Sequence, residues 1–239
     1  MAVILAAGLG SRLGAASASG PKGLLRFGQT TLVERSIQLL RNAGISRVAL
    51  VTGYMAERYR SLCRGSVTAV SNVDFERTGS LESLLCAESL IREDFLVLES
   101  DIVYEKRALE AVLTEKSANV FLAAGLSGMD DAVYVSADSD LVLNGLSKSR
   151  TEIRQPFGEM VGITKLEASA VSSLTQWTQS NGGRPSKKHY EDGLVGISPR
   201  HALKVKRVAD LIWQEVDTED HLKHLREVTE PTLTASEGK

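Results

Sequence analysis

A stretch near the start of the chain carries residues suited to binding phosphate. The sequence AAGLGSRL occupies positions 6–13, and Gly8 and Gly10 let its backbone approach a ligand and point N–H groups at negative charge. Arg12 adds a planar cation that matches phosphate oxygens, and Lys22, which follows a proline, adds a second cation. We therefore expect a phosphate-binding loop with Arg12 and Lys22 as its catalytic cations.

Other glycine-rich motifs fit this loop less well. A dinucleotide-binding fingerprint that opened at Gly8 would need its third glycine at position 13, where the sequence has Leu13. A Walker loop would need a G-K-[ST] triplet, which the sequence lacks. An ordinary glycine-rich turn with a surface arginine is the alternative.

Acidic residues follow a later apolar run. The run FLVL at 95–98 ends in Glu99, Ser100 and Asp101. Ligands of open α/β sheets gather at the carboxyl ends of strands, and alternation places Glu99 and Asp101 on the same side of the chain. A carboxylate of this kind, together with substrate phosphates, suits Mg²⁺. We predict Asp101 as a metal ligand; an acidic turn without function is the alternative.

A second motif repeats this design further along the chain. Glu215, Val216 and Asp217 end a strand-like stretch ahead of an expected helix. If Asp217 lay close to Asp101, the two carboxylates would complete a magnesium site. The alternative is that Asp217 or Thr218 only caps the helix.

The elements that must position these residues alternate along the first half of the chain. Short apolar runs are typical of strands buried on both faces, and Thr31 and Glu34 form a capping box at the start of one expected helix. The expected strands are 2–6, 47–52, 67–71 and 95–98, the expected helices are 31–42, 55–62 and 80–91, and the first loop is 7–20. This order predicts an α/β fold, a three-layer sandwich around a mostly parallel, Rossmann-like twisted sheet.

The second half of the chain has a more mixed pattern. We expect strands at 120–124 and 160–165, a hairpin at 133–137 and 141–143, a helix at 166–179, a polar loop at 181–188, strand character at 208–216 and a helix from 217 to about 228. No repeat or linker forces a boundary, so 1–230 is expected to be one domain and 231–239 a disordered tail.

The overall composition limits the partners of this protein. The chain has 239 residues and a formal net charge of -2, so it offers no general basic field for nucleic acid or an anionic membrane. Its two cysteines, Cys63 and Cys86, lie in no metal-binding or disulfide motif. No apolar run approaches the roughly 18 residues that span a bilayer, and the start lacks a basic leader. We expect a cytoplasmic protein; a homo-oligomer is left open.

Taken together, the motifs resemble the nucleotidyltransferases of the sugar-phosphate and phosphocholine type, which have a GT-A-like fold. Members begin with a strand, then L-A-A-G-x-G-[ST]-R-[LM], then P-K, here at 5–13 and 21–22. Further likeness lies in VTGY at 51–54, Asn72, SL at 83–84, ESD at 99–101, GEMVGI at 158–163 and EVD at 215–217. The sequence resembles in particular the small cytidylyltransferases of phosphocholine and 2-aminoethylphosphonate, and LESDIVYE at 98–105 favours the second.

The resemblance implies a role for each matching residue. Asp101 and Asp217 would hold Mg²⁺, while Arg12 and Lys22 would bind the triphosphate of CTP. The nucleotide would be bound by Leu5, Ala6, Ala7, Gly8, Gly10, Ser11, Gly53, Asn72 and Ser83. Gly79 and Ser80 stand where relatives often carry Asn-Asn, a departure that could mark a different acceptor.

An acceptor with a cationic end suits aromatic faces and carboxylates. Tyr190, Glu191 and Asp192 form such a cluster after the polar loop, and Glu159 and Asp131 are further candidates. Solvated surface acids and one packed tyrosine are the alternative. Three basic residues could meet the phosphorus group of the acceptor, although most are expected at the surface: Lys148, Arg154 and Lys165.

The resemblance implies a Mg²⁺-dependent cytidylyltransferase that transfers CMP from CTP to a small phosphonate, first of all 2-aminoethylphosphonate, and releases pyrophosphate. The alternatives are phosphocholine or hydroxyethylphosphonate as acceptor, a sugar-1-phosphate nucleotidyltransferase, and a non-catalytic nucleotide-binding module. The attacking oxygen is already ionised at neutral pH, so the reaction needs electrostatic stabilisation and positioning rather than a general base.

Overall fold

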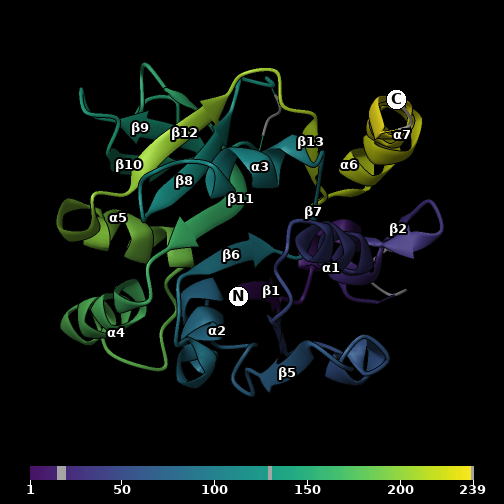
Figure 1. Cartoon of the computed structure of the whole chain (residues 1–239), viewed down its shortest axis with the longest axis horizontal. Helices are drawn as coiled ribbons and strands as arrows, with labels where there is room; N and C mark the ends of the chain where they lie inside the picture. The colour runs from purple at the N-terminus through teal and green to yellow at the C-terminus, as the bar shows by residue number, and fades with distance from the viewer. Residues whose placement is uncertain (15–19, 129–130, 238–239) are drawn as a thin grey trace.

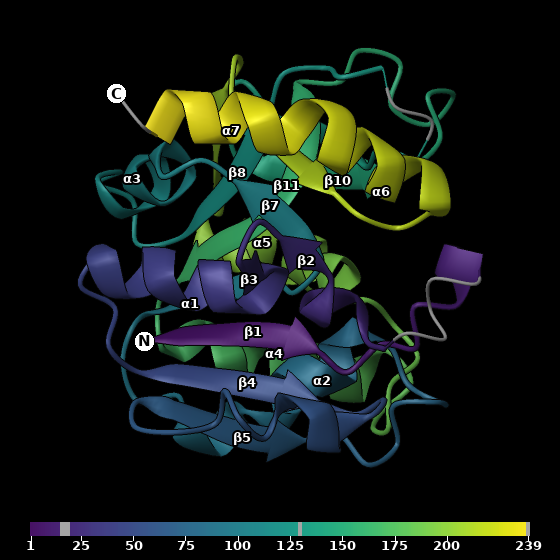
Figure 2. The ribbon, with the colours of Figure 1, turned by 90° about the vertical axis from the view of Figure 1, so that its right-hand side faces the viewer.

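A nine-stranded sheet runs through the molecule, with helices on both faces (Figure 1 and Figure 2). The computed structural model describes residues 1–14, 20–128 and 131–237. The spatial order of the strands is β10-β9-β11-β6-β1-β4-β5, and β8 joins β11 to β12 at the side of this row.

The first half of the chain builds a parallel part of the sheet. β1 (Ala2–Ala6) lies between β4 (Val48–Thr52) and β6 (Phe95–Glu99) and is parallel to both. β5 (Val67–Ser71) extends the same parallel arrangement beyond β4. The carboxyl ends of β1 and β6 therefore meet at one edge, where the glycine-rich loop and the Glu99–Asp101 turn both begin.

Two cores lie on opposite faces of this sheet. All five residues of β1 are buried, the odd-numbered side chains in one core and the even-numbered ones in the other. The helices over the first core are α2 (Ser80–Cys86), α4 (Ser169–Ser180) and α5 (Tyr190–His201), and those over the second are α1 (Leu32–Asn42) and α3 (Arg107–Leu113). The predicted three-layer architecture is confirmed.

The second half makes the sheet mixed rather than parallel throughout. β11 (Gly158–Leu166) is antiparallel to β6, β8 and β9, whereas β12 is parallel to β8. The remaining strands of this half are β8 (Val120–Ala124), β9 (Tyr134–Ala137), β10 (Leu143–Ser147) and β12 (Lys204–Val208). The predicted hairpin is present as β9 and β10, which pair antiparallel.

A separate two-stranded sheet joins distant parts of the chain. β7 (Ile102–Tyr104) pairs antiparallel with β13 (Trp213–Glu215), and Ile102 lies opposite Glu215. Because Asp101 directly precedes β7 and Asp217 closely follows β13, this pairing brings the two predicted acidic motifs together. A second short ribbon, β2 (Arg26–Phe27) with β3 (Thr30–Thr31), follows the glycine-rich loop.

Some helices differ from the sequence prediction. α1 has the predicted capping box: Glu34 N donates to Thr31 Oγ1 at 3.3 Å, and Thr31 N donates to Glu34 Oε2 at 2.8 Å. The helix expected at 55–62 is only a 3-10 turn over Ala56–Tyr59, because Met55 has a left-handed backbone with φ of 47°. The helix expected at 80–91 ends at Cys86 and continues as a short 3-10 turn.

Helix α5 has no counterpart among the predicted elements, and it contains two glycines and a proline. A Cβ added to Gly196 would lie 2.0 Å from Trp177 Nε1, and one added to Gly193 would lie 2.8 Å from Leu174 Cδ2. The glycines therefore allow α5 to pack closely on α4, and this packing outweighs their low helix propensity.

The tail predicted to be disordered at 231–239 is instead mostly helical. α6 (Glu219–His224) leads through a π-helical turn into α7 (Glu230–Glu237). Leu233 is completely buried in a third core that includes Leu13 and Leu32, and Arg35 donates to Glu237 Oε1 at 2.5 Å. Residues 238–239 lie outside the described part of the chain.

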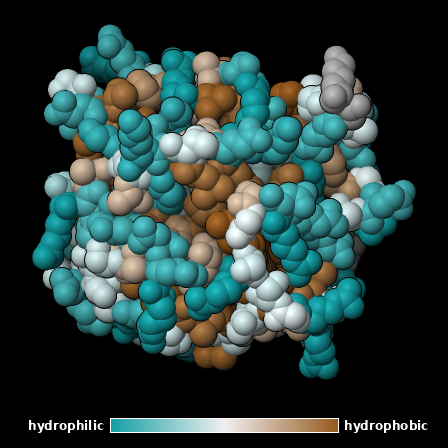
Figure 3. All heavy atoms as spheres, in the orientation of Figure 1, coloured by the Kyte–Doolittle hydropathy of each residue, from teal (hydrophilic) through white to brown (hydrophobic). Residues whose placement is uncertain are grey.

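Within the described ranges no helix is both long and apolar enough to cross a bilayer. On the face seen in Figure 3, hydrophilic residues border a patch of apolar residues near the centre, in the region where Figure 1 draws β6 and β11.

Candidate active site

A cavity of about 330 Å³, here called the large cavity, lies at the carboxyl ends of β1 and β6. Its wall contains the first residues of the glycine-rich loop, the 75–83 segment before and within α2, and the turn after β6. The lining residues are Leu5, Ala6, Ala7, Gly8, Leu9, Gly10, Lys22, Tyr59, Phe75, Glu76, Thr78, Gly79, Ser80, Ser83, Glu99, Ser100, Asp101 and His189.

Most of the predicted nucleotide-binding residues lie in this wall. The large cavity is lined by Leu5, Ala6, Ala7, Gly8, Gly10 and Ser83, but not by Ser11, Gly53 or Asn72. Gly10 has a positive φ of 64°, which a residue with a side chain rarely adopts. Ser11 is exposed on a turn outside the cavity.

Gly53 and Asn72 support the wall from behind. A Cβ on Gly53 would lie 2.6 Å from the Cβ of Phe75, which lines the large cavity. Asn72 is buried, and its Nδ2 donates to Thr78 Oγ1 and Ser83 Oγ, both at 3.0 Å. These two residues therefore hold lining residues in place rather than forming the surface themselves.

Lys22 joins the two predicted acidic motifs at one end of the large cavity. Its Nζ lies 2.9 Å from Asp101 Oδ2 and also pairs with Asp217, whose side chain is almost completely buried. Burial lowers the pKa of Lys22, but Asp101 and Asp217 outweigh it and raise the pKa above its usual value. Lys22 is therefore a fixed positive charge next to the large cavity.

Arg12 reaches the same carboxylates from the outer side. Its guanidinium pairs with Asp131 and lies 2.5 Å from Asp217 Oδ2, while about half of the side chain stays exposed. Despite a lowering effect of burial, Asp217 and Asp131 raise the pKa of Arg12. Arg12 and Lys22 thus both contact Asp217.

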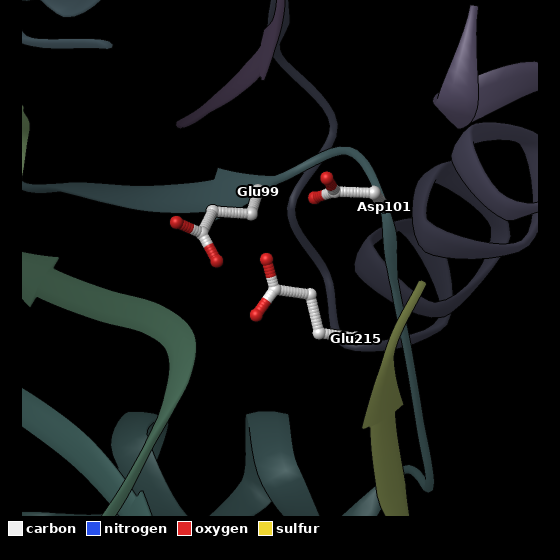
Figure 4. A group of neighbouring side chains, drawn as sticks. All are labelled: Glu99, Asp101 and Glu215. Atoms are coloured by element: carbon white, nitrogen blue, oxygen red, sulfur yellow. The ribbon is translucent and has the colours of Figure 1, made fainter. Parts of the chain in front are cut away.

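Three carboxylates converge beside this lysine (Figure 4). Glu99, Asp101 and Glu215 each offer one oxygen, and these oxygens lie within 4.8 Å of one another. Burial, together with the charges of Asp101 and Asp217, raises the pKa of Glu215 to about 8. Burial, followed by the charge of Glu215, likewise raises the pKa of Glu99 well above its usual value. The cluster is therefore short of positive charge.

This cluster fits a hard divalent cation. Carboxylate oxygens are the ligands that Mg²⁺ prefers, and a cation would relieve the repulsion that raises the pKa of Glu215. Asp101, the first predicted ligand, belongs to the cluster, whereas Asp217, the second, lies at its edge in contact with Lys22. Sequence reasoning did not name Glu99 and Glu215 as site residues, although each stands two positions before a predicted ligand.

The predicted acceptor residues are divided among three places. Tyr190 is completely buried in the core under α2, α4 and α5, so its ring offers no open face, and the prediction that it contacts a cationic acceptor is wrong. Asp192 accepts a hydrogen bond from His189 N at 2.9 Å and caps α5. Glu191 lines a surface hollow, together with Asp192 and Lys148, and burial raises its pKa.

Glu159 and Asp131 line a second cavity of about 30 Å³, here called the small cavity. Glu215 belongs both to its wall and to the carboxylate cluster, so the small cavity adjoins the cluster. Burial works against the ionised form of Asp131, but its bonds to Lys148 and Arg12 lower its pKa.

The three basic residues considered for the acceptor also separate. Lys148 pairs with Asp131 at 2.8 Å and lies near the site. Lys165 instead donates to the carbonyl oxygen of Glu115, and Arg154 is exposed. Only Lys148 of this set therefore lies beside a residue of the small cavity.

Gly79 and Ser80 have a structural role at the rim of the large cavity. A Cβ on Gly79 would lie 2.2 Å from the carbonyl oxygen of Lys188, and Gly79 N donates to the carbonyl oxygen of Ser186 at 2.9 Å. The hydroxyl of Ser80 accepts a hydrogen bond from Tyr190 N at 2.9 Å. The pair joins the start of α2 to the segment before α5.

Curated relatives carry names of nucleotide-transferring enzymes. The chain is 28% identical over 231 residues to CMP-5'-(3-aminopropyl)phosphonate synthase of Streptomyces rubellomurinus, which covers 90% of this chain and 36% of that protein. It is 34% identical over 106 residues to the choline-phosphate cytidylyltransferase of Haemophilus influenzae, covering 44% of this chain and 45% of that protein. A 2-aminoethylphosphonate cytidylyltransferase of Lancefieldella rimae is 30% identical over 105 residues, 43% of each chain. The matches span less than half the length of these relatives.

Solved structures share the fold over nearly the whole chain. CTP:phosphocholine cytidylyltransferase from Streptococcus pneumoniae has a TM-score of 0.73 at 18% identity and covers 95% of this chain and 97% of that chain. The inositol-1-phosphate CTP transferase from T. maritima has a TM-score of 0.80 at 18% identity and covers 98% of this chain and 95% of that chain. The MobA-like NTP transferase domain matches residues 2–192, so the resemblance seen in the sequence is confirmed and the chain belongs to this family.

Proposed function

We propose that this protein is a cytidylyltransferase that transfers CMP from CTP to a small phosphonate, most readily 2-aminoethylphosphonate, and releases pyrophosphate. One observation carries the proposal: Lys22 lies between Asp101 and Asp217 at the end of a cavity that the glycine-rich loop lines. The names of the relatives support CTP as the nucleotide and a phosphonate or phosphate ester as the acceptor.

In the proposed reaction an acceptor oxygen attacks the α-phosphorus of CTP. A new P–O bond forms, the bond to the β-phosphate oxygen breaks, and that oxygen leaves with the electron pair as part of pyrophosphate. Because the attacking oxygen is ionised at neutral pH, no side chain has to remove a proton. The main barrier is repulsion between two anions, and the charge that develops in the transition state adds to it.

The residues of this chain reduce both the repulsion between the two anions and the cost of the charge that develops in the transition state. Backbone N–H groups after β1 and the cation of Lys22 hold the triphosphate, and Arg12 adds positive charge from the outer side of Asp217. Removing one such group from a preorganised site costs on the order of 3 kcal/mol, or about a hundredfold in rate. Asp101 and Asp217, which share Lys22, would hold Mg²⁺, which when bound would withdraw charge from the phosphate oxygens.

The acceptor alternatives follow from the same site. Phosphocholine and hydroxyethylphosphonate could present the same attacking oxygen, and a sugar 1-phosphate is a further alternative. The carboxylates around the small cavity favour an acceptor with a cationic end over a sugar or a hydroxyl.

A pyrophosphate-release assay tests the proposal. Purified protein with Mg²⁺ would be given each nucleoside triphosphate against aminoalkylphosphonates, phosphocholine, hydroxyethylphosphonate and sugar 1-phosphates. We expect CTP with 2-aminoethylphosphonate to give the highest kcat/KM, and Asp101→Asn to lower it about a hundredfold. Turnover only with a sugar 1-phosphate, or full activity of Asp101→Asn, would contradict the proposal.

A further inference from the structure

The small cavity adjoins the carboxylate cluster through Glu215, which belongs to both. It is lined by Ser127, Asp131, Ala132, Glu159, Trp213, Gln214, Glu215 and His221. Its volume of about 30 Å³ compares with the roughly 10–15 Å³ that one water needs on such a measure, so it holds one or two small groups. In Figure 4 the carboxylate of Glu215 points toward those of Glu99 and Asp101, which shows how near this wall is to the predicted reaction centre.

Glu159 is the unusual residue of this cavity. It lies in the middle of the sheet on β11, where its backbone pairs with Ala124 and Tyr134, and its exposed fraction is 0%. Neither of its carboxylate oxygens has a hydrogen-bond partner among the described residues. A buried charged group without a partner costs free energy. We therefore expect a ligand to bring a hydrogen-bond donor into the cavity.

Among the carboxylates that line this cavity, Glu159 and Glu215 are the two that remain to bind a ligand. Asp131 is already paired with Arg12 and Lys148. Trp213 and Glu215 stand two positions apart on β13, so both project from the same face of the strand, and both line the cavity. An indole ring and two carboxylates around so small a space are a suitable environment for one compact cation.

A primary ammonium fits this environment better than a quaternary one. An –NH₃⁺ group brings three N–H donors, which can satisfy the oxygens of Glu159 while its charge faces Glu215 and Trp213. A trimethylammonium group has no N–H donor and would leave both Glu159 oxygens unsatisfied. It also needs more room than a space for one or two water-sized groups provides.

We propose that Glu159, with Trp213 and Glu215, is the ammonium subsite of the acceptor and selects a primary amine against a trimethylammonium group. This inference rests on the proposed function and narrows it: the acceptor is an ω-aminoalkylphosphonate, and phosphocholine is a poor substrate. Glu215 lines the small cavity and also offers an oxygen within 4.8 Å of oxygens of Glu99 and Asp101, so the ammonium subsite adjoins the carboxylate cluster at the predicted metal site.

Three acceptors that differ only at one end provide the first test. With CTP held constant, kcat/KM would be measured for 2-aminoethylphosphonate, for its N,N,N-trimethyl derivative and for propylphosphonate, which replaces the ammonium by a methyl group. We expect the primary amine to exceed each of the other two by about 10-fold or more. A trimethyl derivative used as well as the primary amine would overturn the inference while leaving the cytidylyltransferase proposal intact.

The variant Glu159→Gln provides the second test, because it keeps the size of the side chain and removes its charge. We expect KM for 2-aminoethylphosphonate to rise about 10- to 100-fold, kcat/KM for propylphosphonate to stay within about twofold, and CTP affinity measured by calorimetry to stay unchanged. Glu110→Gln, on the exposed side of α3, is the matched control and should alter none of these values.

The outcomes separate the two proposals. If Glu159→Gln lowers kcat/KM for both acceptors equally, or lowers neither, Glu159 is a buried structural residue and the subsite is refuted. If the wild-type protein binds CTP but turns over no phosphonate, the proposed function has failed, and the subsite falls with it.

Discussion

The two sides of the candidate site are assembled in different ways. The nucleotide side takes most of its lining from consecutive residues after β1 and from the 75–83 segment, all within the first half of the chain. The acceptor side takes Asp131 from a loop, Glu159 from β11, and Trp213 and Glu215 from β13. A phosphate can be held by successive backbone N–H groups, whereas a compact cation needs carboxylates that converge from several directions.

The largest expected effect comes from removing Lys22, the cation that links the two sides. Lys22→Met should lower kcat for CMP transfer at least about a hundredfold, because Asp101 and Asp217 would lose their shared counter-ion and the triphosphate a fixed charge. The rate of pyrophosphate release under saturating CTP measures this kcat. Lys165→Met, which only loses a bond to the carbonyl oxygen of Glu115, is the control. A kcat within threefold of wild type would show that Lys22 does not act on the reacting groups.

The nucleotide side also depends on the end of the chain. A substitution of Leu233 measures how much this end contributes to stability. Its side chain is completely buried in a core with Leu13, which closely follows Gly10, and with Phe27, which closely follows Lys22. Leu233→Ala should lower the free energy of unfolding by about 2–5 kcal/mol in urea titrations, since a buried leucine leaves a cavity. Thr234→Ala, on the exposed side of α7, should change it by less than about 0.5 kcal/mol. Equal stability of both variants would mean that α7 does not hold the loop.

Gly79 lies where the start of α2 contacts the segment before α5, and a substitution at this position tests that contact. Gly79→Ala would place a Cβ 2.2 Å from the carbonyl oxygen of Lys188, so the segment before α5 has to move away from α2. We expect a loss of about 1–3 kcal/mol in unfolding free energy and a several-fold rise in KM for CTP, because His189 in the moved segment lines the large cavity. Gly145→Ala, whose added Cβ would make only ordinary contacts at 3.5 Å or more, should leave both values unchanged. If the two alanine variants behave alike, the contact between the start of α2 and the segment before α5 tolerates the added methyl group.

A hydrogen-bonded glutamate–histidine pair away from the site should give the smallest effect. Glu167 lies 2.7 Å from His201 Nδ1, and the hydrogen bonds from His201 and Asn119 lower the pKa of Glu167. A carboxyl whose folded pKa is lowered stabilises the fold above its unfolded pKa and loses this contribution as the pH falls through the folded pKa. Glu167→Gln should therefore lower Tm by about 2 °C at pH 7, and the difference should vanish on acidification below about pH 4. A difference that persists at low pH would point to packing instead of charge.

Several parts of the molecule follow from local patterns in the sequence. Unbroken apolar runs predicted the central parallel strands, because both faces of such a strand are buried, and Thr31 with Glu34 predicted the start of α1. The sequence also predicted that the glycine-rich loop and Asp101 follow buried strands, as they do after β1 and β6.

The other features depend on contacts between residues that are distant in the sequence. Helix α5 and the ordered tail depend on close packing against α4 and on the burial of Leu233, which intrinsic propensity does not reveal. The pairing of β7 with β13 brings Glu215 beside Asp101 across more than a hundred residues, and β11 brings Glu159 to the small cavity that Glu215 also lines. Tyr190, in contrast, was expected at the acceptor and lies in the core. A convergent set of carboxylates has no sequence spacing of its own, because the sheet register fixes its geometry.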